Sequence, residues 1–175
     1  MGVVTSLGAG KAENWKKLTA GESGIRTITR FPTDGLRTTM AGTVDFIPIE
    51  PFSSTTLSDK LADLATEEAV TQAAIGSKGD FPGPLFLAVA PVEVEWMARF
   101  EAAHATGATS GIDYDAMLKV SGGGKFAGFH NRFLFGSVAD HLVERFGTKG
   151  SPISLSTACA SGATATQLGV KAIRR

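Results

Sequence analysis

The last twenty residues, "STACASGATATQLGVKAIRR" (Ser156–Arg175), decide how this chain folds. They contain Cys159, the only cysteine of the sequence, among small residues. The segment "SPISLST" that leads into them predicts a short β-strand at Ile153–Ser156. Ala160–Arg175 predicts a helix with basic residues in its last turn, where the helix dipole favours them. The pattern is therefore a strand, a sharp turn and a helix, with Cys159 near the N-terminus of the helix.

Two interpretations of Cys159 follow from this placement. A helix N-terminus presents unpaired backbone N–H groups and the positive end of the dipole, and both favour a thiolate. The same N–H groups can stabilise the oxyanion that forms when a thioester carbonyl is attacked. Alternatively, Cys159 is a small apolar residue in a close helix contact, because free cysteines are among the most buried residues. The residues alone leave both interpretations open.

Outward from this segment, helices alternate with short apolar strands, which predicts an α/β layered architecture. The continuous apolar strands are the kind covered on both faces of a sheet. The other expected elements are the end of a strand at Gly2–Gly8, a helix at Lys11–Gly21, a helix at Leu57–Ile75 with Ser58 as its N-cap, a strand at Pro84–Ala90, a helix at Glu93–His104, a short helix at Tyr114–Leu118, and a helix from Ser137 as N-cap to Gly147 as C-cap.

The composition excludes several classes of function. Lys+Arg and Asp+Glu are balanced at 17 each, so no basic surface indicates a nucleic acid or an anionic membrane as partner. No apolar run approaches the roughly 20 residues of a membrane-spanning helix. The single cysteine and the lack of a signal peptide predict a reducing, cytoplasmic location.

Other motifs do not indicate chemistry. "SGGGKFAG" carries Phe126 after Lys125, where a phosphate-binding loop needs Ser or Thr. The three histidines, His104, His130 and His141, lack the spacing of metal ligands, so no metal site is expected. We expect each histidine to be a surface or packing residue.

The segment "STACASG" resembles the active-site signature of the β-ketoacyl-[acyl carrier protein] synthases, condensing enzymes of the thiolase superfamily. "GVVTSLGAGKAENWKKLTAGESGI" (Gly2–Ile25) is similar to the N-terminal segment of that family, and the elements between follow its order. The resemblance implies a thiolase-like layered αβαβα fold, with this chain covering most of its N-terminal half. Residues 1–175 would then be incomplete at both ends. The C-terminal half, which in this family carries two catalytic histidines, a lysine and a gatekeeper phenylalanine, is absent from this sequence.

The resemblance also implies an activity, that of a 3-oxoacyl-[acyl carrier protein] synthase in fatty acid biosynthesis. Cys159 would be the nucleophile, its backbone N–H contributing to the oxyanion hole, in a decarboxylating Claisen condensation with malonyl-[acyl carrier protein]. Val92, Phe133 and Leu134 would line the acyl pocket, in segments whose wording departs from the family pattern, which leaves the preferred acyl length open. No cofactor is implied, because phosphopantetheine arrives on the carrier protein.

The implied partners are an acyl carrier protein and a second copy of the chain. Arg174 and Arg175 could contact an acidic carrier protein, although a solvated helix end explains them equally well. The strand at Ile153–Ser156 would pair across a homodimer, since a free apolar strand edge tends to be covered.

Three alternatives to the synthase remain. A thiolase shares the fold and the cysteine but uses coenzyme A, and the wording around Cys159 favours the synthase. A non-catalytic subunit that sets chain length typically lacks this cysteine, so its presence argues against that role. A stand-alone binding module is disfavoured, because the chain ends on a helix before its sheet would be complete.

Overall fold

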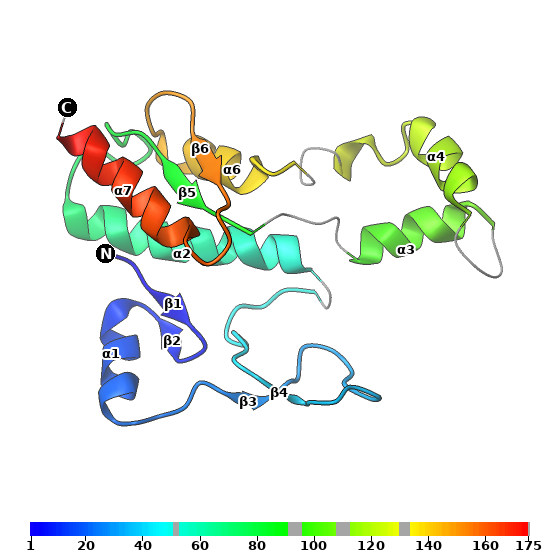
Figure 1. The fold of residues 1–175 in the computed structure, drawn as a ribbon, viewed down its shortest axis with the longest axis horizontal. Coiled ribbons are helices and arrows are strands. Elements are labelled where there is room, and N and C mark those ends of the chain that lie inside the picture. Colours follow the sequence, from blue (N-terminus) through cyan, green and yellow to red (C-terminus); the bar gives the residue numbers. More distant parts are fainter. Residues whose placement is uncertain (51–52, 91–95, 108–112, 130–133, 175) are drawn as a thin grey trace. The chain divides into compact units, whose positions relative to one another are not determined.

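The computed structural model describes residues 1–50, 53–90, 96–107, 113–129 and 134–174. The chain divides into two compact units, Met1–Pro82 and Gly83–Arg175. Figure 1 shows helices together with short strands, and the described strands form three sheets of two strands each. No helix formed by the described residues combines the length and apolar character needed to span a bilayer.

The first unit begins with a hairpin followed by helices. Its elements are β1 (Val4–Thr5), β2 (Gly8–Ala9), α1 (Lys11–Thr19), β3 (Arg26–Thr27), β4 (Met40–Ala41) and α2 (Ser54–Ala73). β1 pairs antiparallel with β2, and β3 pairs antiparallel with β4. The sequence predicted the end of a strand running into a loop at Gly2–Gly8. The structure forms β1 and a turn there, and the chain then returns as β2, which was not predicted.

Asn14 of α1 organises this hairpin. Its side chain is buried, with 8% of its surface exposed, and its amide nitrogen donates to the carbonyls of Gly8 and Gly10 at 2.8 Å each. The Thr5 hydroxyl donates to the amide oxygen of Asn14. One polar side chain therefore supplements the short ladder of this hairpin, and its burial is matched by partners for both its amide nitrogen and its amide oxygen.

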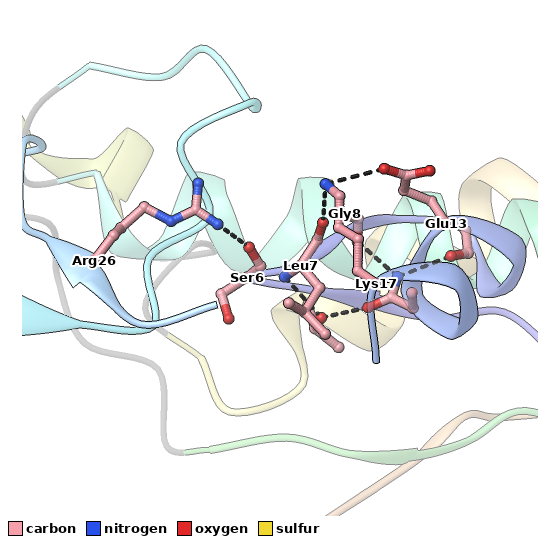
Figure 2. A network of polar contacts seen from close by, with 9 residues as sticks. Ser6, Leu7, Gly8, Glu13, Lys17 and Arg26 are labelled. Carbon is pink, nitrogen blue, oxygen red and sulfur yellow. Dashed lines mark hydrogen bonds and ion pairs between the residues drawn. The ribbon is translucent and has the colours of Figure 1, made fainter. Parts of the chain in front are cut away.

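The side chains of Lys17 and Arg26 donate hydrogen bonds to the turn of the hairpin at Ser6–Leu7 (Figure 2). Lys17 donates to the carbonyl of Leu7 at 2.7 Å and forms an ion pair with Glu13 at 3.0 Å. The Arg26 guanidinium donates to the carbonyl of Ser6. Consecutive carbonyls of the turn are thus each satisfied by a side chain from a different element.

Glu68 of α2 ties the hairpin to the longest helix of this unit. One carboxylate oxygen accepts the N–H of Val3 and the other accepts the N–H of Lys11, both at 2.9 Å. These two backbone donors, that of Lys11 first, hold the pKa of Glu68 below its usual value. Gly2 leads into β1 where a Cβ would lie 1.8 Å from the carbonyl oxygen of Ala65, so only glycine allows this close approach to α2.

The second unit contains a two-stranded parallel sheet. Its elements are β5 (Phe86–Ala88), α3 (Trp96–Ala105), α4 (Tyr114–Gly122), a 3-10 turn η1 (Ala127–Phe129), α6 (Ser137–Phe146), β6 (Ile153–Leu155) and α7 (Ser161–Ile173). β5 and β6 run parallel, with Phe86 opposite Ile153, and α7 packs against β5 (Figure 1). Parallel strands joined through helices confirm the expected α/β class.

The buried apolar side chains of this unit concentrate on α6. Val138, Ala139, Leu142 and Phe146 recur at the spacing of one helix face and are buried. Gly147 ends the helix in the left-handed conformation, with φ of 65°, as the sequence predicted. Among the described residues, α6 therefore supplies most of the buried apolar side chains of the second unit.

Several expected details are wrong. α2 begins at Ser54, and the hydroxyl of Ser58, the expected N-cap, donates instead to the Ser54 carbonyl inside the helix. Gly136 occupies the N-cap of α6, so Ser137 is its first helical residue. The paired strands are only half-buried, and Ile153 is 46% exposed, because the described sheet has two strands and α7 covers one part of it.

Candidate active site

The expected strand, turn and helix are present around Cys159. β6 ends at Leu155, five residues follow, and α7 begins at Ser161. Cys159 therefore lies just past the carboxyl end of a parallel strand and two residues before a helix of thirteen residues. Ligands of open α/β sheets bind at this edge, because the strand ends and helix N-termini meet there.

Cys159 is exposed in this structure. Among the described residues Cys159 is thus not buried in a helix contact, and its role as the nucleophile stays a prediction. Exposure is what a nucleophile needs if a substrate is to reach its sulfur.

The turn before α7 has an uncommon backbone. Ala158 has φ of 49°, in the left-handed region that costs a residue with a Cβ roughly 1–2 kcal/mol. The N–H of Ala160 donates to the Thr157 carbonyl at 3.1 Å, and the N–H of Ser161 donates to the Ala158 carbonyl at 3.1 Å. These bonds close the chain into a tight turn with Cys159 near its apex.

Two hydroxyls of α7 hold the same turn, and the sequence analysis missed both. The Ser161 hydroxyl accepts the N–H of Thr157 at 2.8 Å and donates to the Ala158 carbonyl at 2.7 Å. The Thr164 hydroxyl lies 3.2 Å from that of Thr157 and donates to the Ala160 carbonyl at 3.0 Å. The signal was present in the sequence, since hydroxyl residues four and seven positions after Thr157 face back along a helix toward its start.

The expected acyl-pocket residues are placed only in part. Val92 and Phe133 lie outside the described residues. Leu134 is described and 43% exposed, and its carbonyl accepts the N–H of Ser137 at the start of α6. Leu134 therefore faces solvent, and the role of the three residues stays a prediction.

The structure describes two of the three histidines and one of the two C-terminal arginines. His104 lies in the last turn of α3 and His141 in the middle of α6, while His130 is outside the described residues. Across the described ranges no group of three or more His, Cys, Asp or Glu side chains could hold a metal ion. Arg174 caps the C-terminus of α7, and Arg175 is not described.

Comparison with known proteins identifies the family. Residues 89–175, which include β6, the Cys159 turn and α7, match the family model described as the β-ketoacyl synthase N-terminal domain. Residues 89–175 of the chain belong to the β-ketoacyl synthase family. This confirms the expected resemblance to its N-terminal portion.

Relatives of this β-ketoacyl synthase chain extend the match to the first unit. The ketoacyl synthase alpha subunit of the tetracenomycin polyketide synthase of Streptomyces glaucescens is 30% identical over 182 residues, covering 99% of this chain and 41% of its own. A Streptomyces cyaneus protein that carries the name of a polyketide β-ketoacyl synthase is 28% identical over 176 residues, covering 93% of this chain and 39% of its own. The chain thus spans about two-fifths of the length of these relatives.

A solved structure confirms the fold. The ishigamide ketosynthase/chain length factor superposes with a TM-score of 0.60 at 22% identity, covering 99% of this chain and 42% of its own. The β-ketoacyl synthase chain therefore has the thiolase-like fold over the N-terminal portion.

Proposed function

We propose that the protein is a ketosynthase in which Cys159 carries the growing acyl group. The observation that supports this most directly is an exposed thiol at the turn between β6 and α7, inside the segment that matches the synthase N-terminal domain. A cysteine in this position also favours a catalytic subunit over a chain-length subunit that lacks the nucleophile.

The proposed reaction has two steps. In the first, the Cys159 sulfur attacks the carbonyl carbon of an acyl thioester on a carrier protein, a new C–S bond forms, and the phosphopantetheine thiol leaves with a proton. In the second, a malonyl thioester loses carbon dioxide, its carbanion attacks the acyl carbon, and the Cys159 sulfur leaves as the new C–C bond forms. Backbone N–H groups near Cys159 would stabilise the oxyanion of each tetrahedral intermediate. No metal or resident cofactor enters either step.

The relatives favour polyketide over fatty acid assembly as the pathway. Two of them carry polyketide synthase names, whereas the expected fatty acid role stays a prediction of the resemblance. We therefore propose acyl and malonyl carrier proteins as substrates, a cytoplasmic location, and a polyketide pathway ahead of a fatty acid pathway.

The partner is proposed on similar grounds. The sequence predicts a homodimer through the strand at Ile153–Ser156, of which the structure forms Ile153–Leu155 as β6. The solved relative combines a ketosynthase with a chain length factor, so a related second subunit is the alternative partner. Copurification of two different subunits, or of one, decides between them.

Intact-protein mass spectrometry tests the function. Because Cys159 is the only cysteine, incubation with acyl-carrier protein should add the mass of one acyl group to the wild-type protein and none to Cys159→Ala. Charging by acyl-coenzyme A in preference to the carrier-bound donor would indicate the thiolase alternative. An acyl group that stays on Cys159→Ala would contradict the assignment of the nucleophile.

A further inference from the structure

We propose that Ser161 is a positioning residue that fixes the direction of the Cys159 thiol for acyl transfer. This inference rests on the proposed function, since it concerns the same sulfur. Ser161 is not expected to touch the substrate. It acts through the turn residues on which Cys159 is carried.

The Ser161 hydroxyl contacts two peptide groups of the turn, the one between Ser156 and Thr157 and the one between Ala158 and Cys159. The Ser161 hydroxyl accepts from the N–H of Thr157 and donates to the carbonyl of Ala158, so both hydrogen-bonding functions of one oxygen are used on this turn. A single oxygen atom therefore links the N–H of Thr157 to the carbonyl of Ala158, which forms the peptide bond to Cys159. The next residue along the chain is Cys159.

The conformation that is clamped is one that alanine does not favour by itself. Ala158 has φ of 49°, and residues in sparsely populated backbone regions persist only where the surroundings determine them. The backbone N–H of Ser161 donates to the same Ala158 carbonyl as the hydroxyl does, at 3.1 Å. Removing the hydroxyl deletes its two bonds and leaves the backbone bonds from Ala160 to Thr157 and from Ser161 to Ala158. With fewer bonds to hold it, Ala158 can return to the more favourable region, which rotates the attached Cys159.

Thr164 supports the same turn less directly. Its hydroxyl bridges the Thr157 hydroxyl and the Ala160 carbonyl, so it contacts the residues at the two ends of the turn but not Ala158. Thr166 offers a matched control on the same helix, because its hydroxyl donates to the Gly162 carbonyl at 2.9 Å within α7.

The experiment measures acylation of Cys159 by acyl-carrier protein in the purified protein as a function of donor concentration. Ser161→Ala should lower the maximal rate on the order of tenfold to a hundredfold, as expected for a misplaced reacting group. The half-saturating donor concentration should be unchanged, because Ser161 does not contact the donor. Thr164→Ala should have a smaller effect and Thr166→Ala none.

A pair of variants of equal shape separates positioning from packing. Ser161→Thr keeps the hydroxyl and should restore the rate, whereas Ser161→Val replaces that hydroxyl by a methyl group and should not. This pair also decides the matter if Ser161→Ala fails to fold. Equal rates for wild type, Ser161→Thr and Ser161→Val would overturn the role of Ser161 while leaving the nucleophile in place. A wild-type protein that accepts no acyl group would instead overturn the proposed function and, with it, this role.

Discussion

Among the residues that the structure describes, two alanines adopt the left-handed conformation, Ala74 and Ala158, one in each unit. Ala74 follows α2 with φ of 50°, and its N–H donates to the Val70 carbonyl at 3.1 Å. A left-handed residue just past a helix end is a common way to stop a helix, with glycine as the usual choice. Ala74 therefore needs no explanation beyond its helix.

Ala158 has nearly the same φ but sits in front of a helix, where that conformation is not required to start one. Hydroxyls from the first and second turns of α7 contact Thr157, and the Ser161 hydroxyl also contacts the carbonyl of Ala158 itself. The positive φ of Ala74 therefore follows from the end of its own helix. The positive φ of Ala158 is instead held by side-chain hydroxyls of α7. Of the two alanines, only Ala158 lies next to the exposed thiol of Cys159.

Valine substitutions should give the largest effects at both positions. A β-branched residue is strained at positive φ, so Ala74→Val and Ala158→Val should each lower the free energy of unfolding by about 1–3 kcal/mol. Ala158→Val should also slow acylation of Cys159, whereas Ala74→Val should leave it unchanged. Denaturant unfolding and acylation kinetics on the same samples provide the measurement, and slowed acylation in Ala74→Val would remove the distinction between the two sites.

Glycine substitutions should act in the opposite direction and less strongly. Relief of the Cβ contact, roughly 1–2 kcal/mol, exceeds the added backbone entropy of the unfolded chain, roughly 0.5–1 kcal/mol, so Ala74→Gly and Ala158→Gly should each raise stability by up to about 1 kcal/mol. Thermal unfolding checks both. A destabilised Ala158→Gly would show that the added backbone entropy of the unfolded chain outweighs the relief of the Cβ contact.

The features that the sequence predicted are those encoded locally. The apolar spacing of Val138, Leu142 and Phe146 specifies a helix by its period alone, and α6 follows it. The strand, turn and helix around Cys159 follow from a short β-rich run and the change to a helical pattern after it. Family resemblance then supplied the fold, which the solved relative confirms.

The features that the sequence did not reveal depend on residues far apart or on backbone angles. Glu68 accepts from N–H groups 57 and 65 positions away, and no periodicity predicts such a pairing. Ser58 has the chemistry of an N-cap, but the chain enters the helix four residues earlier, so its hydroxyl turns to the carbonyl behind it. Ser161 escaped notice because the small residues around Cys159 also suit close packing, and only the backbone shows what its hydroxyl contacts.

The two regions should also differ in how their stability depends on pH. Hydroxyls hold the Cys159 turn and do not titrate, whereas the hairpin of the first unit is held by the Glu68 carboxylate. The pKa of Glu68 is lowered by the Lys11 and Val3 N–H groups, so its folded pKa lies below the unfolded one. Its contribution to stability is therefore complete above the ordinary value of 4.5 and is lost as pH falls through the folded pKa.

Unfolding measured from neutral pH to well below 4.5 should show this for wild type and Glu68→Gln. The glutamine keeps one acceptor oxygen but no charge, so the variant should be less stable at neutral pH, and the two curves should converge in acid as wild-type Glu68 takes up its proton. Glu22→Gln removes an exposed carboxylate of the same unit and should stay close to wild type throughout. A gap between wild type and Glu68→Gln that persists in acid would mean that shape, not charge, joins the hairpin to α2. The distinction between a titratable hairpin and a non-titrating Cys159 turn would then fail.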